Sequence, residues 1–415
     1  MTTAAAIKNL SLCFQRPSAQ LSGEKAVIAT NSIPTALPPN HVLIKVDRFG
    51  FSANNVTYQA LGEQAHFRYY DFHAAPDVDG VSSKTHGLVP VWGFGTIILS
   101  SHSKITPGER IYGYLAPCRY LLVPVSPSDV NKHAFYVPRP HLPADRRPYN
   151  QIIRCAADPE YTPTALGEDL TMLYRPLFWT AYWFEDWIFS LGYRGATAFL
   201  ISSASAKTAF CAAFLIRKRR AGGEANSKVK IIGLTSKRNL GFTKGLGLYD
   251  EVVEYDSFTS ALGREKWLYV DVAGNDALNK RLFEHFRTPA SGELVTAVAL
   301  GMTTLAPASE KAAALSFSTN TFAGSSAPVM QFEQFFMPEW LNVRKHQLSL
   351  KEIFGRQHRA WKDLMVDCLP WVRLERVSGA GAVKKAYDAI ASTGFSPDVG
   401  FIWSLWDDEK VATKL

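Results

Sequence analysis

The stretch FLISSASAKTAFCAAFLIRKRR, Phe199 to Arg220, decides the fold. It begins with a short apolar run, continues through small and hydroxyl-bearing residues, and ends with a longer apolar run that leads into basic residues. This order predicts a buried strand, a tight turn and a helix. The basic residues Arg217 to Arg220 precede Gly222, and cations in the last turn complement the helix dipole. We interpret them as a helix end rather than as a nuclear signal or a nucleic-acid patch.

The composition indicates an ordinary soluble protein. The chain has 415 residues, of which 47% are hydrophobic and 20% charged, which is enough for two domains. The sequence has no long uncharged apolar run and no leader pattern, so we expect neither a membrane span nor a signal peptide. We therefore expect a cytoplasmic protein. The end Thr413-Lys414-Leu415 resembles a peroxisomal address imperfectly, which leaves that compartment as an alternative.

The cysteines and the net charge narrow the choice of partners. The five cysteines are scattered and form no C-x-x-C pair, which predicts free thiols rather than disulfides or a zinc knuckle. The net charge of +8 admits nucleic acid, an anionic membrane or an anionic small ligand. Since the densest basic cluster is explained as a helix end, we expect no nucleic-acid partner and favour a small ligand.

Two regions with different strand patterns follow one another along the chain. Residues 41–52, 89–101 and 119–126 have the composition of antiparallel, barrel-like strands. A helical stretch from Leu173 to Leu191 then leads to alternating strands and helices, which predicts a parallel, doubly wound sheet. The expected strands of this sheet are 196–202, 229–235, 251–255, 267–272 and 294–300.

The turn after the first of these strands admits three interpretations. A Walker loop would need glycines where Ile201 and Ala206 stand, which disfavours it. A dinucleotide turn fits better, because Ser203, Ala206 and Ala209 are small residues three apart, although serine could also cap the helix without any ligand. If the turn binds phosphate, its donors come from Ser202, Ser203, Ser205, Ala206, Lys207 and Thr208.

The second strand bears on the choice of cofactor. An NAD site needs a carboxylate at the end of this strand for the ribose hydroxyls, whereas an NADP site needs positive charge for the 2′-phosphate. Here the strand ends in Thr235-Ser236-Lys237-Arg238, with no acid. A solvated helix start is the alternative, but cations there oppose the helix dipole. We therefore expect NADPH, with Val272, Ala273 and Gly274 after the fourth strand as further contacts.

At this point the chain resembles a known superfamily. The segments LISSASAKTAFCAAFLI, IIGLTSKRNLGFTKGLGLYDEVVEYD and VDVAGN are similar to the cofactor domain of the medium-chain dehydrogenase/reductase superfamily, in its zinc-free quinone-reductase and enoyl-reductase branch. The segments HVLIKVDRFGFSANNVTY and VPVWGFGTIILSSHSKITPGERIYGY resemble its N-terminal half. More narrowly, ANNVTYQALGE, YYDF, PVWGFG, LYRPLFWTAYW and SSASAKTA resemble a branch that is known only as a domain of unknown function.

The resemblance implies a fold and a reaction. The fold is α/β, with a GroES-like β-barrel catalytic domain at 1–168, to which 366–415 return, and a Rossmann doubly wound parallel sheet at 169–365. The implied reaction is a zinc-independent, NADPH-dependent reduction of an α,β-unsaturated carbonyl, quinone or related ketone in the interdomain cleft, with a hydrophobic substrate and a homodimer as expectations. The zinc ligands of alcohol-dehydrogenase relatives are absent, since the substrate loop carries Asn54 and Asn55.

The resemblance also implies site residues. Tyr58, Asn55 and Tyr69 are the catalytic candidates, because a phenol could stabilise or protonate an enolate and an amide could donate to a carbonyl. Packing is the alternative for the tyrosines, since aromatic residues make up 12% of the chain. Further expected cofactor contacts are Leu300, Gly301, Phe336 and Arg344.

Two expectations stay open. The stretch from Ser318 to Gln347 is interpreted as a long connection before a helix around 351–365, and connections of this length are usually functional. The alternative function keeps the fold without net redox chemistry, as a lyase or isomerase or as a nucleotide-binding regulatory protein.

Overall fold

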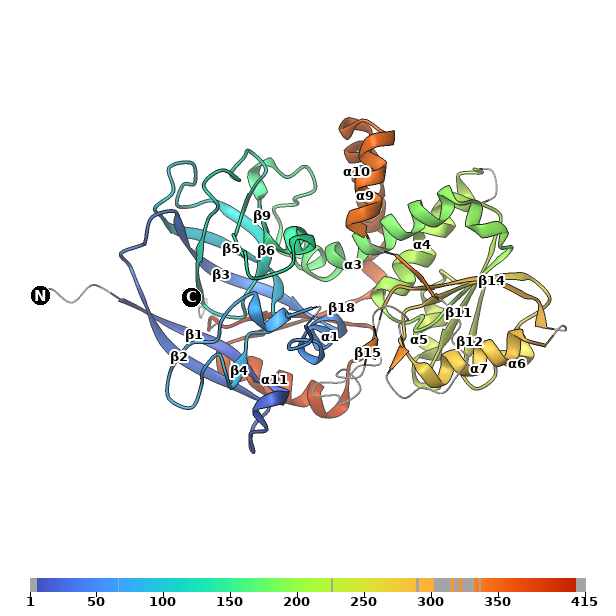
Figure 1. The fold of residues 1–415 in the computed structure, drawn as a ribbon, viewed down its shortest axis with the longest axis horizontal. Coiled ribbons are helices and arrows are strands. Elements are labelled where there is room, and N and C mark those ends of the chain that lie inside the picture. The colour runs from blue at the N-terminus through green and yellow to red at the C-terminus, as the bar shows by residue number, and fades with distance from the viewer. Residues whose placement is uncertain are drawn as a thin grey trace, which may run out of the picture. The chain divides into compact units, whose positions relative to one another are not determined.

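The computed structural model describes residues 6–65, 67–224, 227–288, 291–301, 315–316, 321–322, 332–335 and 337–407. Phe336 and the tail Thr413-Lys414-Leu415 lie outside the described residues, so the expectations placed on them are not addressed. The chain divides into two compact units: unit 1 is Met1–Leu173 with Arg373–Leu415, and unit 2 is Tyr174–Val372 (Figure 1).

Unit 2 is built on a six-stranded parallel sheet with the strand order β12-β11-β10-β13-β14-β17. The strands are β10 (Ala198–Ile201), β11 (Lys230–Thr235), β12 (Glu251–Glu254), β13 (Lys266–Asp271), β14 (Glu293–Ala299) and β17 (Glu333–Gln334). Counted along this sheet, the order is the 3-2-1-4-5-6 of a dinucleotide-binding fold, and it reverses between β10 and β13. All five expected strands are present, displaced by at most two residues at either end. Two short strands, β15 (Leu315–Ser316) and β16 (Thr321–Phe322), pair with each other.

Helices cover both faces of this sheet, with α4 on one face and α6 and α7 on the other (Figure 1). The helices that follow the strands are α4 (Lys207–Ala221), α5 (Leu240–Gly245), α6 (Phe258–Ala261) and α7 (Asp276–Phe286). The face under α6 and α7 is apolar, because Leu200, Leu234 and Tyr269 point toward Phe258 and Leu282. Burial of such side chains contributes about 1.5–3 kcal/mol each.

The basic residues at the end of α4 lie in the last turn of a helix, as expected from the sequence. Helix α4 stops at Ala221 with Lys218, Arg219 and Arg220 in its last turn and Gly222 as its C-cap. Arg219 forms an ion pair with Glu185 at 2.5 Å, and Arg220 forms one with Asp250 at 2.7 Å. These guanidinium groups therefore bind partners of their own unit.

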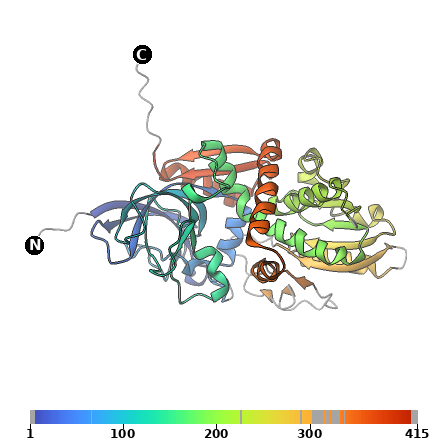
Figure 2. The same cartoon turned by 90° about the horizontal axis from the view of Figure 1, so that it is seen from above.

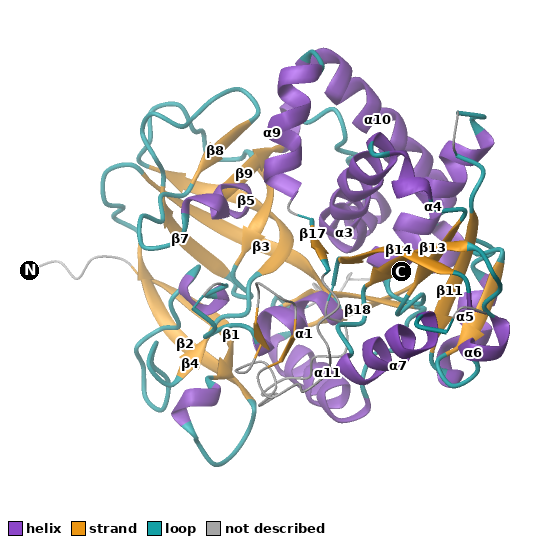
Figure 3. Cartoon of the chain, turned by 45° about the vertical axis from the view of Figure 1, so that its right-hand side comes forward, coloured by secondary structure: helices purple, strands orange, loops and turns teal. Residues whose placement is uncertain are grey.

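Three further helices of the described residues belong wholly or partly to unit 2. Helix α3 (Ala165–Ser190) begins before the expected Leu173, and its unit 2 part packs against α10 (Leu350–Asp367) through Phe178 and Trp361, whose rings lie 5.7 Å apart. Figure 3 shows α9 (Met337–Gln347) and α10 as consecutive helices. The expectation of an unstructured connection was wrong for α9, where an acidic first turn and basic last turn complement the helix dipole.

Unit 1 contains two mainly antiparallel sheets. One has the order β18-β19-β3-β5-β6-β9-β8 with β7 also on β3, and the other has the order β2-β1-β4. The strands are β1 (Ala6–Gln15), β2 (Ala26–Pro34), β3 (His41–Phe51), β4 (His86–Gly87), β5 (Val91–Ser100), β6 (Arg110–Leu115), β7 (Tyr120–Pro124), β8 (Ala134–Tyr136), β9 (Gln151–Arg154), β18 (Arg373–Ser378) and β19 (Val399–Ser404).

Strand β3 organises the larger sheet. Its first half pairs with β7, and its end, at Phe49 to Phe51, pairs with β19 from the far end of the chain. Figure 2 shows this return of the chain beside the N-terminal strands. The helices of unit 1 are α1 (Ala53–Ala60), α2 (Arg147–Asn150), α11 (Ala380–Thr393) and the start of α3. Because α1 follows β3 directly, the position of β3 fixes the helix that carries Tyr58.

Two further expectations can be compared with the structure. All five cysteines are buried and none forms a disulfide, which confirms the free thiols. Among the helices within the described residues, none is both long enough and apolar enough to cross a membrane.

Candidate functional site

The turn after β10 is fastened to β13 by Ser202. The Ser202 side chain is fully buried, and its hydroxyl donates to Oδ1 of Asp271 at 2.8 Å. The same hydroxyl accepts the backbone N–H groups of Val272 at 2.9 Å and Ala273 at 3.0 Å. The hydroxyl of Ser202, which was expected at the cofactor, therefore joins the two strands at the point where the strand order reverses.

Asp271 is the buried acceptor of this junction. It also accepts the N–H groups of Ala273 and Gly274, both at 3.0 Å, and the side-chain amide of Asn279 at 2.7 Å. Burial raises the pKa of Asp271, while the hydrogen bonds from Asn279, Ser202 and Gly274 oppose the rise. Of the expected cofactor contacts after β13, Ala273 and Gly274 thus direct their amides toward this carboxylate, and Val272 directs its amide toward the Ser202 hydroxyl.

The end of β14 is tied to the same residue. The backbone N–H groups of Leu300 and Gly301 both donate to the carbonyl of Asp271, at 2.8 and 3.1 Å. A Cβ on Gly301 would lie 2.9 Å from the carbonyl oxygen of Val272, so glycine is needed for this close approach. Leu300 and Gly301 therefore lie at the carboxyl ends of the strands, where open α/β sheets bind ligands.

Ser203 adopts the backbone conformation that a dinucleotide turn usually reserves for glycine. Its φ is +48°, and its N–H donates to the hydroxyl of Tyr255 at 3.0 Å. The next residue, Ala204, lies against Gly233 of β11, where a Cβ would come within 2.8 Å of the Ala204 side chain. The space for a tight turn is therefore provided by Gly233 instead of a glycine in the turn.

The start of α4 has no side-chain cap. Its N-cap is Ala206, which has no side chain that could accept a first-turn N–H. Ser205, the nearest hydroxyl, accepts a hydrogen bond from the side-chain amide of Asn239 at 3.0 Å. The N-cap position is therefore occupied by alanine and not by a serine, and Lys207 and Thr208 begin the helix.

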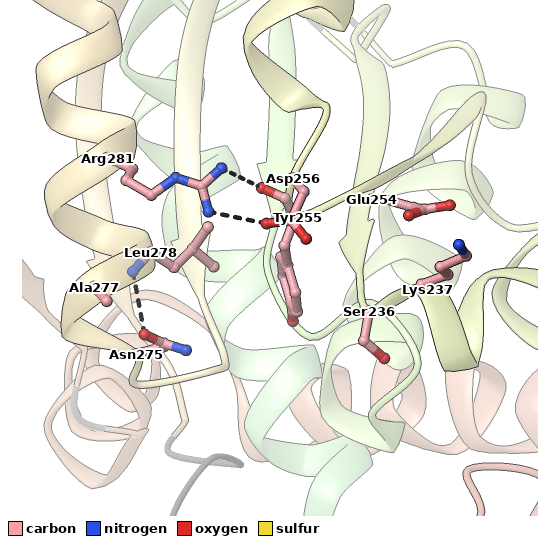
Figure 4. Close-up of a pocket in the computed structure, with 9 residues that line it drawn as sticks. All are labelled: Ser236, Lys237, Glu254, Tyr255, Asp256, Asn275, Ala277, Leu278 and Arg281. Atoms are coloured by element: carbon pink, nitrogen blue, oxygen red, sulfur yellow. Dashed lines mark hydrogen bonds and ion pairs between the residues drawn. The ribbon is translucent and has the colours of Figure 1, made fainter.

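A pocket of about 260 Å³ lies between the ends of β11 and β12 and the start of α7 (Figure 4). Lys237 is exposed and lines it, whereas Arg238 is not among the lining residues. Arg281 donates to the carboxylate of Asp256 at 3.2 Å and to the carbonyl of Tyr255 at 2.9 Å. The lining residues are Ser236, Lys237, Glu254, Tyr255, Asp256, Asn275, Ala277, Leu278 and Arg281.

Several pocket residues were missed at the sequence level. Tyr255 and Asp256 directly follow β12, and Asn275 is the N-cap of α7, where it accepts the N–H of Leu278 at 3.1 Å. Their position after parallel strands was the available signal, because all these ends meet at one edge of the sheet. Tyr255 connects the pocket to the turn, since it lines the pocket while its hydroxyl binds Ser203.

Two other expected cofactor residues lie in different surroundings. Thr235 is buried at the end of β11, and its hydroxyl has no hydrogen-bond partner in the part of the chain that the structure describes. Arg344 instead forms a bidentate ion pair with Asp186, in which two guanidinium nitrogens lie 2.6 and 2.7 Å from the carboxylate oxygens. The structure therefore brings Thr235 to the sheet edge that bears the pocket and gives Arg344 a carboxylate partner in α3.

Unit 1 contains a cluster of four tyrosines. Tyr58 comes from α1, Tyr69 from the turn after it, Tyr114 from β6 and Tyr149 from α2. The Tyr58 ring centroid lies 4.5 Å from that of Tyr69 and 5.5 Å from that of Tyr114, and the Tyr114 and Tyr149 centroids are 4.9 Å apart. The structure thus brings together two of the three expected catalytic residues.

Burial raises the pKa of the tyrosine hydroxyls in this cluster, as the values for Tyr58 and Tyr69 show. Burial raises the pKa of Tyr58, Tyr149 raises it further, and hydrogen bonds from Trp92 and Asn54 lower it. Burial likewise raises the pKa of Tyr69 well above its ordinary value. At neutral pH both phenols are therefore proton donors rather than bases.

The asparagines next to Tyr58 have different roles. Asn55 is buried, its Oδ1 accepts the N–H of Ser52, and its Nδ2 donates to the carbonyl of Pro90 at 3.1 Å. Asn54 instead donates through Nδ2 to the Tyr58 oxygen at 2.7 Å. Asn55 thus caps α1 and binds the start of β5, and Asn54 is the amide in contact with the phenol.

The described residues contain no group of three or more His, Cys, Asp or Glu side chains placed to hold a metal ion. The residues that surround Tyr58 are aromatic rings and amides, which are poor ligands for zinc.

The comparison with protein families identifies the chain as a member of one of them. A family model described as "Protein of unknown function (DUF2855)" matches residues 49–395, and the chain belongs to this family. None of the curated protein sequences matches the chain.

Solved structures share the fold at low sequence identity. A protein from Mesorhizobium loti assigned as an NADPH:quinone reductase has a TM-score of 0.55 at 13% identity, over 97% of this chain and 100% of that one. CurA from Vibrio vulnificus, in complex with NADPH, has a TM-score of 0.55 at 10% identity, over 96% and 99%. An Etr1p mutant, in complex with NADP and crotonyl-CoA, has a TM-score of 0.52 at 14% identity, over 96% and 100%.

These relatives and the sheet order confirm the expected fold class. The chain shares the fold of these structures, with a Rossmann-type parallel sheet in unit 2 and a GroES-like, mainly antiparallel region in unit 1. The narrower resemblance, to a branch known only as a domain of unknown function, is confirmed as well.

Proposed function

We propose that the protein is an NADPH-dependent oxidoreductase that reduces a double bond polarised by a carbonyl, in an enone, a quinone or a related ketone. The observation that carries the proposal is the pocket at the ends of β11 and β12, lined by Lys237 and connected through Tyr255 to the turn before α4. Solved structures with the same fold contain NADP or NADPH, which supports the choice of cofactor.

The residues present fit a dinucleotide with an extra phosphate. Helix α4 begins at Lys207 after the N-cap Ala206, and helix N-termini bind phosphate through their first-turn amides and the helix dipole. Lys237 adds a cation beside Ser236, where the 2′-phosphate of NADP lies in this type of sheet. The hydroxyl of Thr235, which has no hydrogen-bond partner among the described residues, is a further donor at the same strand end.

The pocket contains a second cation, but also two carboxylates. Arg281 is held by Asp256, and Glu254 lines the same space as Lys237. The formal charges of these four side chains cancel, so the preference for NADPH over NADH depends on direct contact with Lys237 rather than on a strongly positive pocket.

In unit 1 the chain contributes a proton donor. Because burial keeps Tyr58 protonated, its hydroxyl can donate a hydrogen bond to a substrate carbonyl oxygen and stabilise the negative charge that develops there. Tyr69 is a second protonated phenol in the same cluster. When bound, NADPH supplies the hydride for this chemistry.

Carbonyl polarisation by hydrogen bonds agrees with the donor set of the site. The amide of Asn54 and the indole of Trp92 donate hydrogen bonds to the Tyr58 oxygen, so the phenol itself is the group that can donate to a substrate carbonyl. A buried donor aimed at a developing oxyanion can lower a barrier by about 3–4 kcal/mol without a metal. We therefore propose a zinc-independent mechanism.

The experiment is a measurement of NADPH oxidation with a panel of enones and quinones, with the Lys237→Ala and Tyr58→Phe variants in parallel. Substrate-dependent oxidation that falls in both variants is the expected result. Binding of NADPH without oxidation by any substrate would favour the alternative, in which the fold serves a lyase or isomerase step or a regulatory role. Absence of NADPH binding would exclude both functions for the nucleotide pocket.

A further inference from the structure

The oxygen of the Tyr58 phenol is fixed from its own helix. Asn54 precedes Tyr58 by one turn of α1, and its Nδ2 donates to the Tyr58 oxygen at 2.7 Å. Because residues i and i+4 lie on the same face of a helix, this contact forms within α1 itself. The indole Nε1 of Trp92, from β5, donates to the same oxygen over a longer 3.5 Å.

This arrangement determines where the Tyr58 hydrogen points. A hydroxyl oxygen that accepts a hydrogen bond in one direction presents its own hydrogen in another. The bond from Asn54 also strengthens as the phenol loses its proton, because hydrogen bonds to a charged oxygen are stronger than those to a neutral one. Asn54 therefore both orients the donor and stabilises the phenolate that donation leaves behind.

We propose that Asn54 is a positioning residue for Tyr58, which holds the phenol oxygen as an acceptor so that the hydroxyl hydrogen is available to the substrate. The inference rests on the proposed function. In the step, the Tyr58 O–H bond breaks, its electron pair stays on the phenol oxygen, and the proton bonds to the substrate oxygen; bound NADPH would supply the hydride to the substrate carbon. Asn54 acts through Tyr58 and makes no contact with the substrate in this scheme.

The surroundings of the phenol contain few charges that could compete with Asn54. The titratable groups packed around it are the phenols of Tyr69, Tyr114 and Tyr149. The cations that influence these phenols are Arg146, which acts on Tyr69, and Arg139, which interacts with Tyr114. Asn54 is thus the closest hydrogen-bond donor to the Tyr58 oxygen among the described residues.

The test combines kinetics with a probe of the phenol itself. The Asn54→Ala variant is compared with Thr57→Ala, a change on the same helix to a residue whose hydroxyl donates to the carbonyl of Ala53 and not to the Tyr58 oxygen. NMR of protein labelled with ¹³C at the tyrosine ζ-carbon reports the phenol oxygen, and the Tyr58 resonance is identified by its loss in Tyr58→Phe. We expect Asn54→Ala to shift this resonance and Thr57→Ala to leave it unchanged.

The kinetic arm has its own expected result. Asn54→Ala should lower kcat for NADPH oxidation about 10-fold, consistent with the loss of one charge-assisted bond, with no change in the Kd for NADPH. Asn54→Asp should lower kcat further at neutral pH, because a carboxylate accepts a hydrogen bond from the Tyr58 hydroxyl and turns its hydrogen away from the substrate. The variant should recover activity in acid as the carboxyl group is protonated. Asn54→Ala should show no such recovery.

Two results would overturn the inference. An unchanged Tyr58 resonance in Asn54→Ala would show that the Asn54 amide does not position the phenol, and this result would hold whether or not the protein has the proposed activity. A wild-type kcat in Asn54→Ala together with a strong loss in Tyr58→Phe would refute the positioning role while leaving the proposed function intact. If Tyr58→Phe itself has full activity, the proposed role of Tyr58 is wrong and the inference falls with it.

Discussion

The hydroxyl of Tyr255 accepts a hydrogen bond from the backbone N–H of Ser203 at 3.0 Å, and this contact fixes the turn between β10 and α4. Ser203 has a φ of +48°, a conformation that costs a side-chain-bearing residue about 1–2 kcal/mol. The Tyr255 contact helps to hold the serine there. The nucleotide pocket and the turn are therefore coupled through one side chain.

Removal of that hydroxyl should loosen the turn. Tyr255→Phe is expected to lower the free energy of unfolding by about 1 kcal/mol, because the N–H of Ser203 loses its partner. Tyr136→Phe is the control, since the Tyr136 hydroxyl makes no hydrogen bond with any residue that the structure describes, and it should change stability by less than about 0.5 kcal/mol. Denaturant unfolding measures both, and equal effects would show that the contact does not stabilise the turn.

The carboxylate of Asp271 should be essential for stability. Asp271→Asn replaces an acceptor of several hydrogen bonds by a group with one acceptor oxygen, so we expect a loss of about 2–3 kcal/mol. Asp256→Asn removes a carboxylate that is 91% exposed and should have little effect on unfolding. A thermal unfolding curve of Asp271→Asn that coincides with the wild type would contradict the role given to this junction.

Histidine 73 should make the protein sensitive to acid. Burial, with the nearby charge of Arg139, lowers the pKa of His73 to about 3. The unfolded chain binds a proton near the ordinary value of 6.5 and the folded chain does not, so stability is present above that pH and is lost as the pH falls toward 3. The loss should approach about 1.4 kcal/mol per pH unit. In His73→Gln the free energy of unfolding should depend less steeply on pH between 6.5 and 4, and parallel curves would refute the prediction.

Substitution of Tyr58 should slow the chemical step without weakening the binding of NADPH. We expect Tyr58→Phe to lower kcat about 100-fold, a typical value for a lost proton donor, with the Kd for NADPH within about 2-fold of the wild type. Tyr70→Phe is the matched control, because the Tyr70 hydroxyl is buried without a hydrogen-bond partner among the described residues and lies outside the proposed site. Steady-state kinetics decide the matter; a loss that appears only in KM would mean that Tyr58 binds substrate without donating a proton.

Much of the fold could be predicted from local patterns. The strand-helix alternation between residues 198 and 299 and the basic end of α4 are encoded in short runs of side chains, so the five expected strands were located to within two residues. Helix α9 was missed because its sequence has little apolar periodicity, and its stabilising charges lie at its two ends.

The site was less accessible to sequence analysis. The spacing of Ser203, Ala206 and Ala209 located the turn, but it could not reveal that the hydroxyl of Ser202 bonds to Asp271 or that Gly233 supplies the space next to Ala204. These contacts join residues that are far apart in the chain. The different roles of Asn54 and Asn55 could not be predicted for the same reason. Asn54 binds the phenol of Tyr58 and Asn55 binds the carbonyl of Pro90, and these contacts form only in the folded unit.

The most direct test of the proposed nucleotide site is a fluorescence titration of the wild type and the Lys237→Ala variant with NADPH and with NADH. We predict micromolar binding of NADPH, weaker binding of NADH, and a roughly 10-fold loss of NADPH affinity in Lys237→Ala with no change for NADH, as expected when one phosphate contact is removed. Equal affinities for the two cofactors in both proteins, or no binding of either, would contradict the account.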